Sequence, residues 1–188
     1  MFVRFYYMNH AIETELKVLL SREQFNRLAS FYQPLTFVRQ INTYYKNNNS
    51  DHYAFRIREK KGTLLFTLKN KTTEGVMEYE KIINGEPEDD PDVVRTVSSF
   101  GIEPPYEKLG KLVTYRAMVI SELAELCFDI NIYNGRLDYE IEYEVKKEHD
   151  HLKAFRQILE KAGIEYVPNK DSKYKRFVKS AGDNDNAK

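Results

Sequence analysis

Hydrophobic and charged residues alternate along much of this chain with a period of two, which is the period of a β-strand. In the segment 12–18 the odd positions carry Glu13, Glu15 and Lys17, and the even positions are mostly apolar. Comparable alternation recurs through the chain, usually with one charged face. The pattern predicts about eight strands, at 12–18, 37–45, 55–58, 64–69, 77–80, 115–120, 126–132 and 139–145.

Helical periodicity appears in fewer places. Ser21 is a suitable N-cap for a helix over 22–32, and Pro91 favours the start of a second helix over 91–100, which Gly101 ends. A third helix is predicted over 151–162, before Gly163, and a basic fourth over about 171–180. We expect one domain over 1–182. The residues at the chain end are small and polar, which predicts a disordered tail over 183–188.

Composition narrows the class of protein. The 188 residues suit one substantial domain, and no apolar run approaches the roughly 20 residues that cross a bilayer. The 29 basic and 29 acidic residues cancel, so a nucleic-acid partner is not expected. Residues 1–8 lack the features of a secretory signal, which favours a cytoplasmic protein. The 14 tyrosines could supply a dimer surface, leaving monomer and homodimer open.

The charged faces of the predicted strands are sorted by sign. Any one of them could be an ordinary solvated sheet face. Several carboxylates on one face of a strand, spaced about 7 Å apart, repel one another unless cations stand between them. The sorted positions are the acidic Glu13, Glu15, Glu78, Glu80, Asp129, Glu140, Glu142 and Glu144, and the basic Arg56, Arg58, Lys69 and Arg116.

About eight antiparallel strands can close into a barrel, which puts one face of every strand inside. The predicted helices over 22–32, 91–100 and 151–162 carry apolar stripes that need an apolar partner, so we expect them outside, with the charged faces inside. This predicts an α+β fold: a closed antiparallel eight-stranded β-barrel, or tunnel, with a charged interior. Such an interior suits an anionic ligand held by cations, and oxygen ligands favour Mg²⁺ or Mn²⁺.

The order of these motifs resembles that of the CYTH domains, or triphosphate tunnel metalloenzymes, particularly the small bacterial members of the Bacillus type. Their signature is Glu-x-Glu-x-Lys near the N-terminus, here Glu13, Glu15 and Lys17. The later elements resemble family motifs over nearly the whole chain. They are Gln40 to Tyr45, Phe55-Arg56-Ile57-Arg58, Phe66-Thr67-Leu68-Lys69, Glu78 with Glu80, Arg116, Asp129, Glu140 with Glu142 and Glu144, and Ser172-Lys173-Tyr174.

The sequence departs from the family pattern in three places. Lys46 stands where many members have an aspartate, and the segment Met77-Glu78-Tyr79-Glu80 lacks a common arginine. The histidine-phenylalanine motif of class IV adenylate cyclases does not precede Glu13, which argues against cyclase activity.

The resemblance implies a metal-dependent hydrolase that removes orthophosphate from a small triphosphate, inorganic or organic. A water that is bound to the metal or oriented by a carboxylate would attack the terminal phosphorus, with Glu140, Glu142 and Lys17 as catalytic residues. The implied metal ligands are Glu13, Glu15, Asp129, Glu140, Glu142 and Glu144. The implied triphosphate ligands are Lys17, Arg56, Arg58, Lys69, Arg116 and Lys173.

Two other functions stay open at this stage. One is an adenylate cyclase that converts ATP to cyclic AMP and pyrophosphate, and the other is a non-catalytic protein that binds polyphosphate or nucleotide. For single residues, Glu78 and Glu80 could be salt-bridge partners of the arginines, and Lys173 could cap a surface helix. Cys127 is expected to be a packing or wall residue.

Overall fold

The computed structural model describes residues 8–46, 53–73 and 75–185, which form two compact units. Unit 1 consists of the described residues up to Glu13 together with Gln40–Leu112. Unit 2 consists of Thr14–Arg39 and the chain from Val113 onward. The expectations for the first seven residues and for positions 186–188 of the tail lie outside the described residues.

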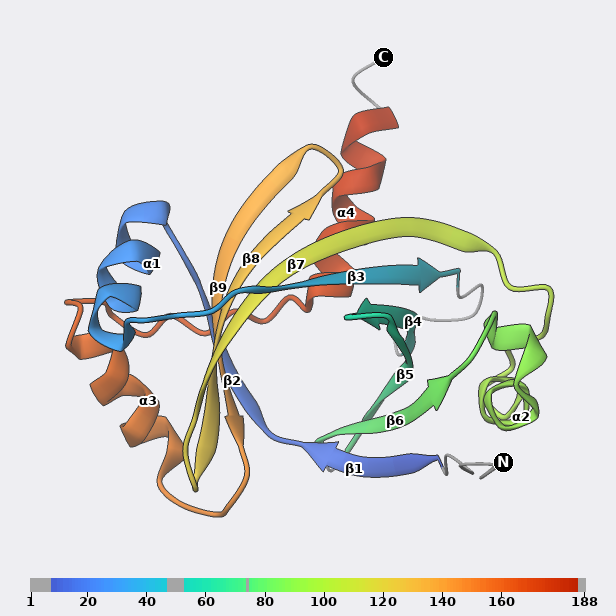
Figure 1. Ribbon diagram of the computed structural model, residues 1–188, viewed down its shortest axis with the longest axis horizontal. Coiled ribbons are helices and arrows are strands. Elements are labelled where there is room, and N and C mark those ends of the chain that lie inside the picture. Colours follow the sequence, from blue (N-terminus) through green and yellow to red (C-terminus); the bar gives the residue numbers. More distant parts are fainter. Residues whose placement is uncertain (1–7, 47–52, 74, 186–188) are drawn as a thin grey trace. The chain divides into compact units, whose positions relative to one another are not determined.

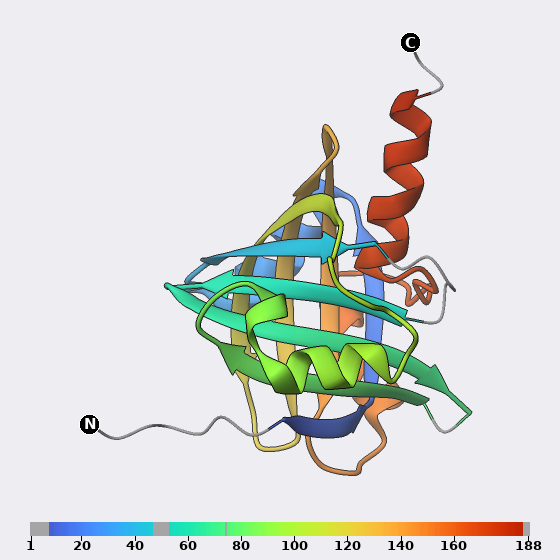
Figure 2. The same ribbon diagram turned by 90° about the vertical axis from the view of Figure 1, so that its right-hand side faces the viewer.

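Unit 1 is an antiparallel sheet with one helix. Its strands follow the order β1-β6-β5-β4-β3, and the beginning of β7 lies beside β3. The helix α2 lies across this sheet, as the yellow-green ribbon in Figure 2 shows. The bounds are β1 (Asn9–Glu13), β3 (Val38–Tyr45), β4 (Tyr53–Lys60), β5 (Thr63–Thr72), β6 (Gly75–Ile83), the 3-10 turn η2 (Pro87–Asp89) and α2 (Pro91–Ser98).

The core of unit 1 lies between α2 and one face of the sheet. Phe55, Phe66 and Leu68 are fully buried there, against Val93 and Val97 of α2. Since side chains alternate along a strand, Arg56, Thr67 and Lys69 point to the other face.

Unit 2 has the strand order β7-β8-β9-β2, all antiparallel, and three α-helices (Figure 1). The helices α1 and α3 lie on one side of this sheet and α4 lies on the other. The bounds are β2 (Glu15–Leu20), α1 (Arg22–Ala29), the 3-10 turn η1 (Ser30–Tyr32), β7 (Lys108–Ile120), β8 (Ala124–Tyr133), β9 (Arg136–Val145), α3 (His151–Glu160) and α4 (Lys173–Asp185).

The apolar face of the unit 2 sheet carries the core. Phe25 and Leu28 of α1 and Phe155 of α3 are buried against Phe128 of β8 and Ile141 of β9. Ser21 caps α1 through its side chain, which accepts from the backbone N–H of Gln24, as the sequence predicts. The opposite face keeps the charged positions of the alternation, and α4 lies against this charged face.

The predicted strand over 12–18 is two strands in the structure. Glu13 pairs with Val76 of β6, whereas Glu15 pairs with Glu144 of β9, so the chain changes partner at Thr14. Nine strands are therefore described, not eight. Among the described residues, neighbouring strands follow the order β1-β6-β5-β4-β3-β7-β8-β9-β2, so β1 and β2 are the two end strands. The α+β class is confirmed and the closed eight-stranded barrel is not, because the order of the described strands has two end strands, β1 and β2, that do not pair with each other.

The helices also differ in detail from the prediction. The helix expected over 22–32 ends at Ala29 and continues as the turn η1, and α4 extends beyond Ser180. In the described part of the chain, no helix is both long enough and apolar enough to span a bilayer.

Candidate active site

The charged face of the unit 2 sheet is built from rows of residues that stand opposite one another on neighbouring strands. One row joins Arg116 of β7, Asp129 of β8 and Glu140 of β9. The next joins Cys127, Glu142 and Lys17, and a third joins Glu125, Glu144 and Glu15. Carboxylates and cations thus lie within reach of each other across the strands.

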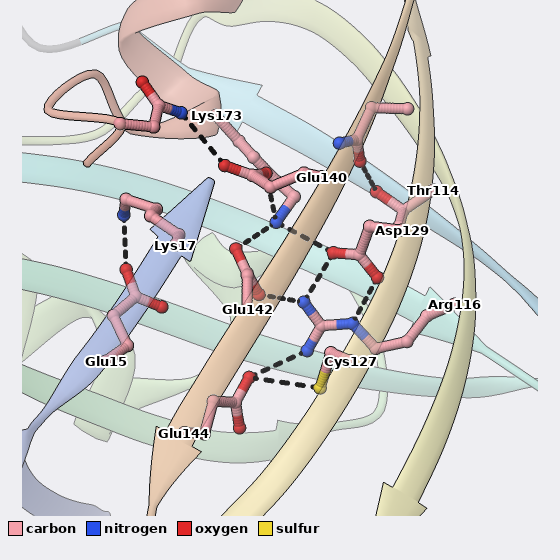
Figure 3. A network of polar contacts seen from close by, with 12 residues as sticks. Glu15, Lys17, Thr114, Arg116, Cys127, Asp129, Glu140, Glu142, Glu144 and Lys173 are labelled. Atoms are coloured by element: carbon pink, nitrogen blue, oxygen red, sulfur yellow. Dashed lines mark hydrogen bonds and ion pairs between the residues drawn. The ribbon is translucent and has the colours of Figure 1, made fainter. Parts of the chain in front are cut away.

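Arg116 is the central cation of this face (Figure 3). Its Nε and Nη2 donate to the two carboxylate oxygens of Asp129, each at 2.7 Å. Its Nη2 also contacts Glu142, and its Nη1 donates to Glu144 at 2.9 Å. The guanidinium therefore aligns three carboxylates from two strands, with the planar two-pronged geometry that suits arginine.

Lys173, the first residue of α4, brings a second cation to the same face. Its Nζ lies 2.8 Å from Asp129 and 2.9 Å from Glu140, and it also contacts Glu142. These three carboxylates, the carboxylate triangle, surround the ammonium in Figure 3. Ser172 caps α4, since its hydroxyl accepts from the backbone N–H of Lys175 at 3.2 Å, which explains a serine before this lysine.

Arg176 stands one turn further along α4 and contacts the same strands. Its Nη2 and Nη1 donate to the two oxygens of Glu140 at 2.8 and 3.1 Å, and its Nε donates to Asp138 at 3.1 Å. Asn169 donates to Glu140 as well, at 3.1 Å. Glu140 is completely buried, and these partners satisfy its charge.

Burial and charge act in opposite directions on the triangle. Burial alone would raise the pKa of Asp129, but Arg116 and Lys173 outweigh burial and hold that pKa below its usual value. Burial likewise works against ionisation of Glu142, and Lys173 and Arg116 hold its pKa well below the usual range. The pKa of Lys173 is raised despite burial, chiefly by Asp129, Glu140 and Glu142. Asp129 and Glu142 are thus held in their ionised form.

The charges on this face do not cancel. Glu125 of the third row is paired with Lys146, and among the remaining charges the carboxylates exceed the cations by two, which is the charge of one divalent cation. We call the set the polar-face cluster: six carboxylates, Glu15, Asp129, Asp138, Glu140, Glu142 and Glu144, and four cations, Lys17, Arg116, Lys173 and Arg176.

The donor set of the carboxylate triangle fits a hard cation. Asp129, Glu140 and Glu142 each offer one oxygen, and these oxygens lie within 4.8 Å of one another. Oxygen-only ligands favour Mg²⁺ or Mn²⁺ over softer metals. Among the described residues, a second group, Glu125, Cys127 and Glu144, meets the same distance limit. Glu13 and Glu15 fall in neither group.

Cys127 lies on the polar face but is buried, and its Sγ donates to Glu144 at 3.7 Å. Burial raises the pKa of this thiol well above its usual value, although Arg116 acts in the opposite sense. A thiol of this kind is a poor nucleophile, in keeping with a packing role.

A second set of sorted charges lies in unit 1. Lys69 contacts Glu13, and its Nζ is 3.4 Å from Glu78, which also lies 3.9 Å from Arg56. Glu80 accepts from the hydroxyl of Thr67 at 3.3 Å. We call these residues the unit 1 cluster, with three cations and three carboxylates: Arg56, Arg58, Lys69, Glu13, Glu78 and Glu80.

Buried polar groups without partners occur in the unit 1 cluster, at Arg56, and at Gln40 of the same unit. In the described part of the chain, the buried Nε of Arg56 donates no hydrogen bond and the buried Oε1 of Gln40 accepts none. Arg58 donates through its Nε to Asn42 at 2.9 Å. Glu78 forms ion pairs with Arg56 and Lys69. A salt-bridge role for Glu78 was one of the alternatives that the sequence left open.

Comparison with known proteins decides the family. The profile of the CYTH domain matches residues 11–177, which is most of the chain. The chain belongs to the CYTH domain family. A Bacillus subtilis (strain 168) protein, YjbK, named as a candidate triphosphatase, is 29% identical over 190 residues. The alignment covers 89% of this chain and 94% of YjbK.

Two solved structures resemble this CYTH domain. One, from Bacillus halodurans and described as a candidate adenylate cyclase, is 30% identical, with a TM-score of 0.78 and coverage of 89% of this chain and 98% of that one. The other, HpAC1 from Hippeastrum, is 23% identical, with a TM-score of 0.72 and coverage of 89% and 96%. HpAC1 is described as a candidate adenylyl cyclase with a dominant triphosphatase activity, and here it supports the fold alone.

Structure places the predicted residues of this CYTH domain in two groups. Glu15, Lys17, Arg116, Asp129, Glu140, Glu142, Glu144 and Lys173 belong to unit 2, and Glu13, Arg56, Arg58 and Lys69 belong to unit 1. The sequence reasoning missed Arg176, Asn169 and Asp138. A signal for Arg176 existed, because it follows Lys173 by three residues and so shares a face of the predicted helix.

Proposed function

We propose that this chain hydrolyses a small triphosphate, inorganic or organic, with Mg²⁺ or Mn²⁺ as cofactor, on the charged face of unit 2. The observation that carries the proposal is the carboxylate triangle with its interleaved cations, buried and carrying a net negative charge. The name of YjbK, a relative that aligns over nearly its whole length, supports the same activity.

The triangle is the part of the site that would hold the metal. Asp129, Glu140 and Glu142 supply the oxygens, and Glu144 stands next to them on β9. A divalent cation bound there would neutralise charge on the phosphate oxygens and make the terminal phosphorus easier to attack.

The cations of unit 2 would have different roles. Arg116 uses all three of its nitrogens on carboxylates, so it acts by keeping Asp129, Glu142 and Glu144 aligned. Lys17 contacts Glu15, and an ammonium has three N–H donors, so Lys17 keeps donors for a phosphate oxygen. Lys17 stands opposite Glu142 in the sheet, so a phosphate that Lys17 bound would lie next to the carboxylates.

The reaction needs one water, and Glu142 or Glu140 would orient it. The water oxygen forms the new bond to the terminal phosphorus, and the bridging P–O bond breaks with its electron pair passing to the departing diphosphate. The carboxylate orients the water by accepting a hydrogen bond from it, and one proton of the water passes to solvent. Positioning and charge neutralisation supply most of the acceleration in such a reaction.

Arg56, Arg58 and Lys69 are also proposed to bind the triphosphate, on the resemblance described above. They belong to the unit 1 cluster, whose own carboxylates balance their charge. Their role is tested separately below.

The test is an assay with identified products. Purified protein is incubated with tripolyphosphate, ATP, GTP or thiamine triphosphate in Mg²⁺ or Mn²⁺. We expect orthophosphate, lost in Glu142→Gln and kept in Glu122→Gln, whose side chain is 80% exposed and pairs with Lys147. Equal turnover by Glu142→Gln would refute the site.

A cyclase is the second candidate, because the Bacillus halodurans relative carries that description. It would produce cyclic AMP and pyrophosphate from ATP and no orthophosphate from tripolyphosphate. Binding of all four compounds without any product would indicate a non-catalytic binding protein instead.

A further inference from the structure

The ammonium of Lys173 occupies the centre of the carboxylate triangle. It lies 2.8 Å from Asp129 and 2.9 Å from Glu140 and also contacts Glu142, so each of its three N–H donors has a carboxylate to meet. Its side chain is only 10% exposed. The lysine therefore stands where the oxygens of all three carboxylates converge (Figure 3).

We infer that Lys173 and a divalent cation compete for the carboxylate triangle, so that metal binding expels the lysine ammonium. The inference rests on the metal site of the proposed function. Two cations in one set of three oxygens would repel strongly in a buried environment. Arg116 and Arg176 also donate to oxygens of the triangle, but among the described residues only the Lys173 ammonium contacts all three carboxylates, so it is the cation that a metal at their centre would displace.

Contacts of Arg176 and Asn134 would keep α4 in place while the lysine side chain moves. The guanidinium of Arg176 binds Glu140 and Asp138, and Asn134 donates to the backbone oxygen of Phe177 at 3.1 Å and to Ser180 at 2.9 Å. These contacts hold the second turn of α4 on the sheet and do not involve Lys173. Lys173 is the first residue of the helix, so its long side chain can rotate outward while α4 stays docked.

Expulsion would also place the ammonium close to the bound metal but outside the triangle. An anionic phosphate on that metal would then be its nearest partner. In the metal-free protein the lysine offsets part of the negative charge of the triangle, and in the loaded protein it would be free to donate to a phosphate oxygen. Lys173 thus links metal binding to triphosphate binding.

Metal affinity of the full chain, measured by titration calorimetry with Mn²⁺ and without triphosphate, tests the competition. Lys173→Met removes the charge and keeps the length of the side chain, so we expect Mn²⁺ to bind roughly tenfold or more tighter. Lys175→Met is the matched control on the same helix; its lysine is 51% exposed, pairs with Asp171 and should leave the affinity unchanged. Equal or weaker affinity in Lys173→Met would overturn the inference.

Wild-type protein gives a second measurement that does not depend on the folding of a variant. Acetylation by a water-soluble reagent, followed by peptide mass spectrometry, reports the reactivity of each lysine. We expect acetylation of Lys173 to rise several-fold with saturating Mg²⁺ and that of Lys175 to stay constant. An unchanged rate at Lys173 contradicts expulsion.

These outcomes separate the inference from the proposed function. Tighter Mn²⁺ binding by Lys173→Met in a protein that hydrolyses none of the four triphosphates would support the competition and reject the hydrolase. Turnover with no effect of Lys173 on metal affinity or labelling would support the hydrolase and reject the competition.

Discussion

Arg116 and Asp129 stand opposite each other on β7 and β8 and are joined by two parallel hydrogen bonds, both 2.7 Å long. Asp129 is completely buried and Arg116 is 8% exposed. A buried pair of this kind aligns its neighbours, and removing either partner leaves an uncompensated charge.

We expect Arg116→Met to lower the free energy of unfolding by about 3–5 kcal/mol, the usual effect of breaking one side of a buried ion pair. Urea denaturation without metal measures the change. Lys46→Met, which breaks an exposed pair with Glu107, is the control and should cost less than about 1 kcal/mol. Similar small losses in both variants would mean that the buried pair does not stabilise the fold.

The lowered pKa values of Asp129 and Glu142 predict acid sensitivity. Both groups hold fewer protons folded than unfolded in acid, so their stabilisation is complete above the unfolded pKa values of about 3.9 and 4.3 and is lost as the pH falls toward their folded values. Without metal, the urea concentration at the midpoint of unfolding should decrease as the pH is lowered from about 6 to about 3. Asp129→Asn should flatten that dependence, and an unchanged slope would contradict the assignment.

The pKa of Glu80 is shifted in the opposite direction, upward. Burial and the charge of Glu78 raise its pKa, despite Arg56, Arg58 and Thr67. Its stabilising contribution is present below the unfolded pKa and is lost as the pH rises through the folded value. Glu80→Gln keeps the acceptor for Thr67 and should raise the Tm at pH 7 by up to about 2–4 °C. It should not raise the Tm at pH 4.

Glu78→Gln is the matched comparison for that variant. Glu78 pairs with Lys69 and Arg56, so its neutralisation removes ion pairs and should lower the Tm at pH 7. Tm changes of the same sign in the two variants would show that the environment of Glu80 does not cause the change in Glu80→Gln.

Cys127 should resist alkylation in the native protein. Its thiol is buried and its pKa is raised, so little thiolate forms at pH 8. We expect iodoacetamide to label it slowly in buffer and rapidly in urea, as measured by intact mass. Fast native labelling would show that this part of the polar face opens to solvent.

The proposed phosphate ligands of the two units can be compared by kinetics. Lys17→Met should raise KM by about tenfold or more, the effect of losing a charged hydrogen bond. If Arg58 binds the same triphosphate, Arg58→Met should raise KM similarly. An unchanged KM in Arg58→Met would remove the unit 1 arginine from the substrate site.

Periodicity of two predicted the strands well, because alternation follows directly from the geometry of a strand between a core and a polar face. The positions of Asp129, Glu140 and Glu142 on one face required no tertiary information. The split of the first predicted strand at Thr14 could not be read in this way. Alternation continues unbroken through Thr14, and only the choice of partner strand distinguishes Glu13 from Glu15.

Local patterns along the chain were enough to predict the strands and the sorted charges, and the order of the motifs was enough to predict the CYTH family. The structure decided which charges meet. It assigned Glu13 to one cluster and Glu15 with Lys17 to another, and it brought Lys173 and Arg176 onto carboxylates more than thirty residues away along the chain. Contacts of that kind depend on register and helix docking, which local periodicity does not encode.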